Sequence, residues 1–438
     1  PGSEPARGGS ALRVAPNIVT APSQRRRGWR ASLALLGHRN YALVWWAGLI
    51  SNVGTWMETV AVGDLVALRT DQAGWTALVA AAGFLPMGLL GPIGGALADR
   101  LDRRRLLLAM TAAQMVAAGA LAVLAAADQI SPPLLAVVVF AAGCVAGLGF
   151  PAYSAMLPDL VPGEDLLAAM SLSQAQWNMG RVVGPALAGL AIGLGSYASA
   201  FAVNAASFAV MLLALRALRL TPAPRPTDED PLWTRIRVGA VTAWSVPGVR
   251  SAIVFISIVA LTASPFIALV PAMARVHFDG DAALTARLVT AQGVGAVLGA
   301  LALPVLAERF GRYRMLIVSL GVLAILLAAY GLSPSSLWAT VAIVGVGAAY
   351  MSVLSGIGTV VQLRAPAALR ARVLSFYFLA LGVVYPIGAT IQGPLADRAG
   401  MGVVTAASGV AMVAALGVVR MVSPARFEAM DDPEPDDL

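Results

Sequence analysis

Glu58 lies in the middle of an apolar stretch of this sequence, within residues 41–68. Ser51, Thr55 and Glu58 follow one another at intervals of four and three residues, which places them on one face of a helix. Inside a bilayer, ionisable side chains usually face a bundle interior or a water-filled cavity, and they mark a path for an ion or a solute. Glu58 is therefore a candidate for taking up and releasing a proton.

A second polar stripe lies within residues 167–194, where Gln174, Asn178 and Arg181 have the same spacing. Because each stripe has one charge, we expect both faces to be turned away from lipid, toward the bundle interior or a water-filled cavity. Loss of water in a closing cavity favours the neutral acid, whereas Arg181 or water favours the carboxylate. The alternative interpretation is a static ion pair that fixes helix packing.

The composition places these helices in a membrane. Of the 438 residues, 58% are hydrophobic and only 12% are charged, whereas soluble domains have about 25% charged residues. Apolar stretches of about 20 residues, the length that crosses about 30 Å of hydrocarbon, occur twelve times. The predicted spans are 41–68, 74–97, 106–126, 133–155, 167–194, 197–218, 249–273, 284–306, 314–332, 337–362, 371–395 and 401–422.

The arginines predict the orientation of these spans. With the N-terminus in the cytoplasm, 25 arginines fall in inner segments and 4 in outer loops, which is the asymmetry that the positive-inside rule describes. We therefore expect a protein of the cell membrane with both termini in the cytoplasm. The expected cytoplasmic segments are a disordered tail at 1–40, a central loop at 219–248 and an acidic tail at 423–438.

An internal repeat divides the spans into two groups of six. Residues 94–105 align with residues 303–314, and the long connection at 219–248 separates the groups. Two duplicated halves, at 41–218 and 249–422, are typical of transporters whose substrate site lies between the halves near the bilayer midplane.

Residues 95–104, GALADRLDRR, resemble the loop 2-3 signature of the major facilitator superfamily, although Asp102 stands where that pattern has Gly. The segments GTWMETVA, FPAYSAMLPDLVPGEDLLAAMSL and RVVGPALAG are similar to its branch of transmembrane secretion effectors, which are siderophore and drug exporters. The resemblance implies an all-α membrane fold of twelve helices in two pseudo-symmetric six-helix bundles. It also implies that the first and fifth helices border the central cavity, and we therefore expect Glu58 and Arg181 to oppose each other there.

The signature implies a conformational latch at a cytoplasmic helix end. Gly94 and Gly95 permit close helix approach, and an acid at this position can accept hydrogen bonds from arginines and from a helix N-terminus. The alternative is that the arginines only set the topology. The latch residues are Gly95, Asp99, Arg100, Arg103 and Arg104.

Gly184, Pro185 and Gly189 form a packing motif in the fifth span. Small residues let helices approach, and a proline interrupts the backbone hydrogen bonds. The motif resembles the antiporter signature of exporters in the superfamily, and generic tight packing is the alternative.

Asp64 is expected to be a solvated charge at the edge of an outer loop.

The second half has polar stripes without a mid-helix acid. Ser355 and Thr359 lie in the tenth span, and Tyr385 and Gln392 lie in the eleventh. We therefore expect this half of the cavity to be polar and aromatic, which suits a moderately hydrophobic solute that is neutral or cationic.

Several classes of function are disfavoured. The sequence has no Walker pattern, so an ion gradient is the expected energy source. His38 and His277 stand alone, so no metal, cofactor or enzymatic activity is expected, and the charges form no basic face for nucleic acid.

We predict a monomeric, proton-coupled exporter of small molecules that works by rocker-switch alternating access. The alternatives are an importer or uniporter of the same fold, and a membrane receptor without transport activity.

Overall fold

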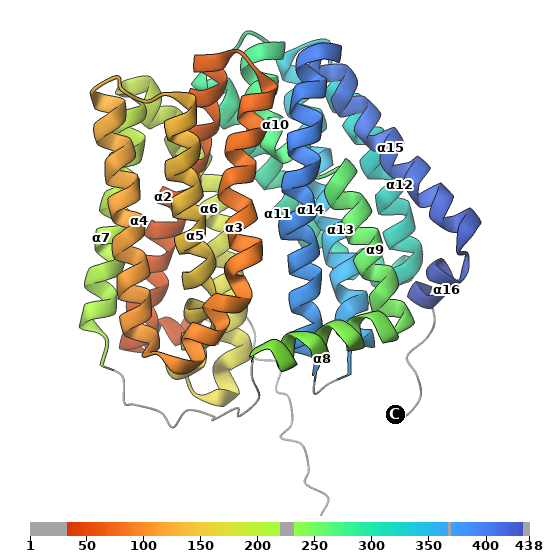
Figure 1. The fold of residues 1–438 in the computed structure, drawn as a ribbon, viewed down its shortest axis with the longest axis horizontal. Helices are drawn as coiled ribbons and strands as arrows, with labels where there is room; N and C mark the ends of the chain where they lie inside the picture. Colours follow the sequence, from red (N-terminus) through yellow and green to blue (C-terminus); the bar gives the residue numbers. More distant parts are fainter. Residues whose placement is uncertain (1–32, 220–231, 367–368, 432–438) are drawn as a thin grey trace, which may run out of the picture.

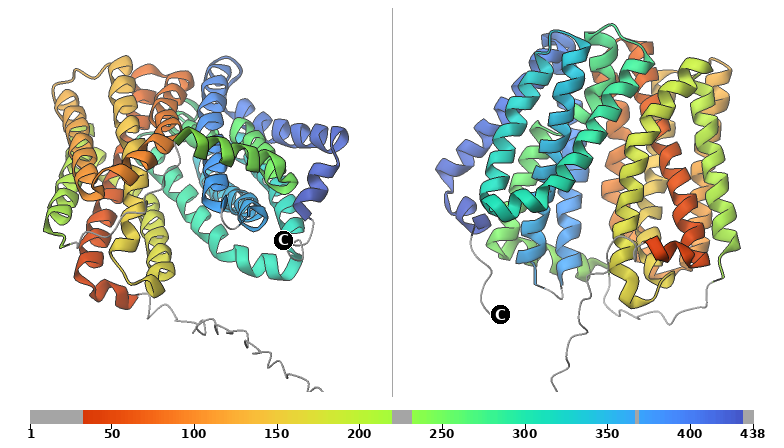
Figure 2. Two further views of the ribbon diagram at one scale, coloured as in Figure 1. Left: turned by 60° about the horizontal axis from the view of Figure 1, so that its bottom comes forward. Right: turned by 180° about the vertical axis from the view of Figure 1, so that it is seen from behind.

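The computed structural model describes residues 33–219, 232–366 and 369–431. All regular elements in these ranges are helices, and the chain forms two groups of long helices that lie side by side (Figures 1 and 2). The first half consists of α2 (Arg39–Thr70), α3 (Ala73–Arg100), α4 (Arg103–Ala126), α5 (Pro132–Met156), α6 (Leu166–Leu194) and α7 (Tyr197–Ala217). Short 3₁₀ turns occur at Leu35–Gly37, Leu157–Asp159 and Gly163–Asp165.

The second half begins with a span that is broken into three pieces. These are α9 (Pro247–Thr262), α10 (Phe266–Ala272) and a π-helical turn at Met273–His277. Five unbroken helices follow: α11 (Ala282–Phe310), α12 (Arg312–Gly331), α13 (Ser336–Arg364), α14 (Arg370–Ala399) and α15 (Met401–Val422). Each predicted span therefore coincides with a helix or, in this one case, with a broken helix.

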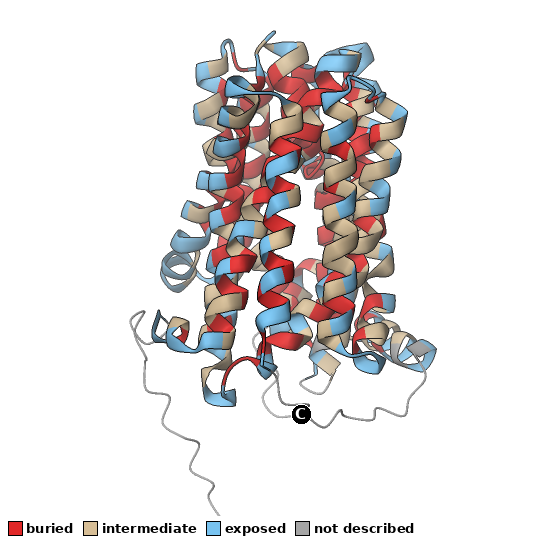
Figure 3. Ribbon diagram, turned by 90° about the vertical axis from the view of Figure 1, so that its left-hand side faces the viewer, coloured by how far each residue is buried: buried red, intermediate tan, exposed pale blue. Residues whose placement is uncertain are grey.

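Ten helical segments of the described chain are long and apolar enough to cross a membrane. The helices α2 and α6 are also long, with 32 and 29 residues, but they are less apolar because they contain the two polar stripes. Large apolar side chains cover the outer surface, and among them Leu194 is 89% exposed and Met421 is 77% exposed. Buried residues lie mainly on the sides of the helices that face other helices (Figure 3). The all-α integral membrane fold is confirmed.

Two helices lie outside the twelve spans, and the sequence analysis did not anticipate them. The helix α8 (Leu232–Ser245) lies across one end of the second half, in the segment expected to be a loop (Figure 1). A Cβ atom on its Gly239 would lie 2.9 Å from the Phe376 ring of α14, so the two helices pack closely. The helix α16 (Ala425–Asp431) packs Phe427 against Phe255 of α9, with 4.8 Å between the ring centroids.

The two halves contact each other through the pairs α3 with α14 and α6 with α11. A Cβ atom on Gly88 would lie 3.0 Å from the carbonyl carbon of Gly382, so the backbones of α3 and α14 meet near the middle of both helices. Their close contacts continue from there to Gly74, away from α8. Toward the α8 end the two helices diverge (Figure 1).

Candidate functional site

Glu58 binds to α7 within the first half. The Asn204 side-chain amide donates a hydrogen bond to the Glu58 carboxylate, with 2.7 Å between Nδ2 and Oε2. Ser207 donates in turn to Asn204 Oδ1 over 3.1 Å. A Cβ atom on Gly54 would lie 2.5 Å from that oxygen, so the absence of a side chain there makes room for the amide. The sequence analysis missed Asn204, although an asparagine inside an apolar span is a signal of the same kind as Glu58.

Arg181 does not face Glu58. Its guanidinium carbon lies 5.7 Å from the centroid of the Trp56 ring. Trp56 and Glu58 are two residues apart, which separates their side chains by about 200° around α2, and no ion pair joins Glu58 to Arg181 in the described part of the chain. The expected opposition of the two charges is therefore wrong, and so is the static ion pair between them.

The other polar residues of the two stripes bond within their own helices. Thr55 donates to the Ser51 carbonyl over 2.9 Å, and Asn178 donates to the Gln174 carbonyl over 2.9 Å. Gln174 is exposed and Asn178 is partly exposed. Both continue the helix face of Arg181 toward the α8 end, where the two halves diverge.

Gln176 is a structural residue that the sequence analysis did not single out. Its side chain is buried, with an exposed fraction of 2%. The amide nitrogen donates to the Trp45 carbonyl over 2.9 Å, and Oε1 accepts a hydrogen bond of 3.4 Å from Tyr153. Gln176 thereby links α6 to α2 and α5.

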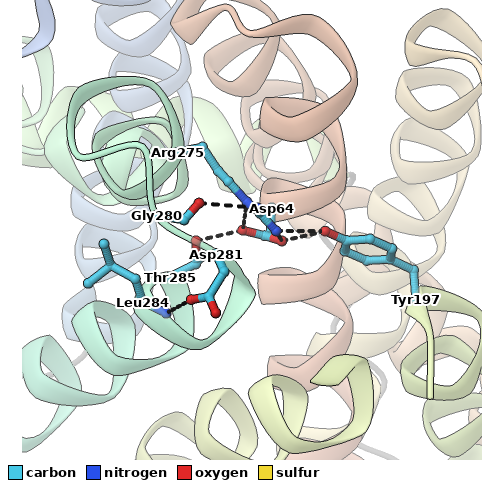
Figure 4. Close-up of polar contacts among 7 residues, drawn as sticks. All are labelled: Asp64, Tyr197, Arg275, Gly280, Asp281, Leu284 and Thr285. Carbon is cyan, nitrogen blue, oxygen red and sulfur yellow. Dashed lines mark hydrogen bonds and ion pairs between the residues drawn. The ribbon is translucent and has the colours of Figure 1, made fainter. Parts of the chain in front are cut away.

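A buried polar network joins the halves at the end opposite α8 (Figure 4). Asp64 of α2 accepts two hydrogen bonds from Arg275, of 2.9 Å from Nε and 2.7 Å from Nη2. The Tyr197 hydroxyl of α7 donates to the same carboxylate over 2.5 Å, and Thr285 of α11 donates over 2.6 Å. Arg275 also donates to the Gly280 carbonyl over 3.1 Å. We call Asp64, Tyr197, Arg275 and Thr285 the cross-half network.

Asp64 is not the solvated loop-edge charge that the sequence predicted. It is fully buried, because the second half covers the α2 end at which it stands. A buried ion pair of this kind is costly to break from one side, since the remaining charge loses its partner in a dry environment.

A second polar contact crosses between the halves at the same end. The Asp397 carboxylate of α14 accepts hydrogen bonds from the backbone amides of Ala73 and Gly74, over 2.6 and 2.9 Å. These amides open α3, where free N–H groups and the helix dipole favour an anion. A Cβ atom on Gly74 would lie 2.7 Å from that carboxylate, so the contact requires a glycine.

The residues of the signature loop form contacts within the first half. Arg103 donates to the Ala155 carbonyl over 2.9 Å and to the Asp159 carboxylate over 3.0 Å. Arg104 donates to the last carbonyls of α7, those of Leu215 and Arg216, over 2.7 and 2.6 Å.

Three further members of the predicted latch lie at the α3 end. Asp99 and Arg100 are exposed. A Cβ atom on Gly94 would lie 2.7 Å from the Leu148 carbonyl of α5, whereas one on Gly95 would meet nothing within 4 Å. The close helix approach therefore depends on Gly94, and the inclusion of Gly95 in it is wrong.

The packing motif of α6 serves two different contacts. A Cβ atom on Gly184 would lie 2.5 Å from the Trp56 Cβ atom, within the first half. One on Gly189 would lie 2.7 Å from the Ala286 Cβ atom of α11, across the two halves. Pro185 lies buried between them.

The predicted residues of the second half differ in their roles. The Tyr385 ring is buried and packs edge-on against Phe84 of α3, at 5.3 Å between centroids. Gln392 instead binds the end of α9, donating to the Thr262 carbonyl over 2.7 Å. The Thr359 hydroxyl donates to the Ser355 carbonyl of its own helix over 2.8 Å.

A shallow groove of about 430 Å³ lies between α6 and α11, and Gly189 is the one predicted site residue among the described residues that line it. The described residues contain no group of three His, Cys, Asp or Glu side chains that is arranged to hold a metal ion.

Comparison with known proteins decides the family. The family model of the transmembrane secretion effectors matches residues 30–436. The chain belongs to this family. It is similar to the multidrug efflux pump Tap of Mycolicibacterium fortuitum, with 28% identity over 89% of this chain and 96% of that protein. It is 27% identical to the enterobactin exporter EntS of Citrobacter koseri, over 84% of this chain and 88% of that protein.

Solved structures of the major facilitator type share the fold of this secretion-effector chain. A bacterial homologue of the iron transporter ferroportin superimposes with a TM-score of 0.67 at 16% identity, over 90% of this chain and 99% of that one. A bacterial homologue of the lysosomal transporter Spinster has the same TM-score at 14% identity, over 91% and 99% of the two chains. This member of the secretion-effector family is a multi-pass membrane transporter.

Proposed function

We propose that the protein is a secondary active exporter of small, moderately hydrophobic molecules and that protons drive it. Its similarity to proteins named as efflux pumps and exporters supports export. The observation that carries the mechanism is that the polar contacts between Asp64 and Arg275, and between Asp397 and the start of α3, gather at one end of the halves. Toward the other end, α3 and α14 diverge.

This arrangement suits alternating access by a rocker switch. Transporters with repeated halves expose a midplane site to each side in turn by rocking one half against the other. With the α8 end in the cytoplasm, the cross-half network would close the outer end while the inner end is open. An outward-open state would break this network and close the signature-loop end instead.

Glu58 is the proposed proton carrier. It is a partly buried carboxylate in the body of α2, its partner Asn204 is neutral, and no cation pairs with it in the described part of the chain. A carboxylate without a fixed cation can be neutralised by a proton when its surroundings lose water. Such a group changes its charge as the halves move.

Flux in proteoliposomes tests the proposed function. A panel of fluorescent aromatic solutes is offered to the purified protein under an imposed pH gradient, with and without a membrane potential. An exporter coupled to protons moves at least one solute against its concentration gradient only when the pH gradient is present. Equilibration without accumulation would indicate a uniporter, and binding without flux would indicate a receptor.

Topology can be checked by labelling from outside the cell. We expect an impermeant maleimide to modify a cysteine at Gln72, an exposed residue between α2 and α3, in the Cys144→Ala background. A cysteine at Trp244 of α8, which is 58% exposed, should stay unmodified until the membrane is opened. The reverse pattern would contradict a cytoplasmic α8.

The signature loop is proposed to act on the motion of the halves. Asp99→Asn should slow transport several-fold while substrate affinity changes little, because Asp99 lies at the end of α3, far from the middle of the helices. Stopped-flow flux and equilibrium binding measure the two effects separately. A large loss of affinity in the folded variant would place Asp99 in the substrate site.

A further inference from the structure

Arg181 is a buried cation that has no partner among the residues that the structure describes. Its exposed fraction is 9%, and Nε is fully enclosed without a hydrogen-bond acceptor. Within the described part of the chain, the guanidinium forms no ion pair, and its contact is with the face of Trp56. A buried charge is stable only when an opposite charge or several hydrogen bonds compensate it. Arg181, which also packs against Gly293 of α11 in the second half, is therefore a candidate to bind an anion between the halves.

Other unpartnered donors lie around the same region between the halves. Trp56 Nε1 and the Tyr385 hydroxyl are also fully enclosed without partners. Tyr350 of α13, whose hydroxyl donates to Ser264 over 2.9 Å, is near enough to Arg181 to interact with it electrostatically, and Tyr385 is similarly near Tyr350. Arg181 and Trp56 come from the first half, and the two tyrosines come from the second.

A second aromatic ring lies beside Trp56 and another beside Tyr385. Trp177 packs edge-on against Trp56, with 6.1 Å between the centroids, and Phe84 does the same against Tyr385. Flat rings of this kind bind aromatic or other apolar surfaces, while the N–H and O–H groups at their edges can donate hydrogen bonds to a ligand. Together, these rings and donors have the chemistry that binds an apolar body with an acceptor group.

Resting on the proposed function, we propose that the transported molecules are amphiphilic anions whose carboxylate, or a similar oxyanion, binds Arg181 between the halves. The oxyanion supplies the charge that Glu58 does not supply, because Glu58 bonds to Asn204 on the opposite side of α2. A planar guanidinium binds a carboxylate through two parallel hydrogen bonds, which gives both affinity and orientation. This assignment replaces the neutral or cationic solute that the sequence suggested.

Binding of a matched pair of probes tests the assignment without requiring transport. The probes are 9-anthracenecarboxylate and its neutral methyl ester, titrated into the purified protein in phosphatidylcholine nanodiscs. We expect the acid to bind about tenfold to a hundredfold more tightly than the ester. Arg181→Gln should remove this preference and leave ester binding within about twofold, whereas Arg181→Lys should keep part of the preference. Arg105→Gln, at an exposed arginine of α4, is the matched control and should change neither affinity.

Equal binding of acid and ester by the unaltered protein would overturn the proposal, even if no Arg181 variant folds. An equal loss of both probes in a folded Arg181→Gln variant would also overturn it, because Arg181 would then be a packing residue. Loss of acid binding in discs that contain phosphatidylglycerol would assign the site to a lipid headgroup and overturn it as well. Failure of the proposed function looks different, since acid binding would persist in a protein that moves no solute in proteoliposomes.

Discussion

Glu58→Gln is expected to abolish accumulation of substrate driven by a pH gradient. Glutamine keeps the size and the hydrogen bond with Asn204 but can neither take up nor release a proton. One proton that crosses a gradient of one pH unit releases about 1.4 kcal/mol, which sustains about tenfold accumulation of a solute that exchanges one-for-one with the proton when no membrane potential is imposed. The variant should lose this accumulation completely, as measured by the substrate concentration ratio in proteoliposomes.

Exchange of labelled for unlabelled substrate without a gradient is the internal control. It requires motion of the halves but no net proton movement, so Glu58→Gln should retain it. Glu428→Gln, at an exposed carboxylate of α16, is the matched substitution and should leave accumulation unchanged. If Glu58→Gln still concentrates substrate under a pH gradient alone, Glu58 is a packing residue and the coupling site lies elsewhere.

Arg275→Ala is expected to open the end of the protein opposite α8. The change leaves the Asp64 carboxylate buried without its cation, and breaking a buried pair from one side costs about 3–5 kcal/mol. Because only the closed arrangement buries Asp64 against the second half, the equilibrium should shift toward the open one by about a hundredfold to several thousandfold. The double variant Asp64→Asn with Arg275→Gln removes both charges and should recover most of the closed population.

Spin labels report this shift directly. The labels are attached to cysteines that replace Leu194 and Leu332 in the Cys144→Ala background. Both positions are exposed, and each lies at the end of a helix in a different half. The distance between the labels should lengthen in Arg275→Ala and return in the double variant. An unchanged distance distribution would show that the cross-half network does not hold this end closed.

Most of the fold follows from the sequence, because the length of an apolar stretch is enough to identify a membrane span. The predicted boundaries of α6 and α15 lie within one residue of those observed. The helix α8 was missed because its buried face is short, resting on small residues such as Gly239 and Ala243, while its tryptophans at 233 and 244 point outward. A search for length and apolarity does not detect such a helix.

The candidate site was less predictable, because helical spacing tells which residues share a face but not which helix that face meets. Glu58 and Arg181 lie on polar stripes as expected, yet the hydrogen-bond partner of Glu58 lies on α7 and not on α6. Asp64 and Arg275 are 211 positions apart, and each resembles an ordinary charge at the end of a span. Only the packing of one half on the other makes them partners.

The contact between Gly88 and Gly382 lies near the middle of α3 and α14, and in the proposed rocking motion it would be the pivot. Two rigid helices that touch at mid-length move their ends in opposite directions, so separation of one pair of ends brings the other pair together. A continuous pore would require both pairs of ends to separate at once, and this would break the contact between the two glycines. Under the proposed mechanism, the two glycines that let these backbones touch would therefore also limit leakage of ions through the protein.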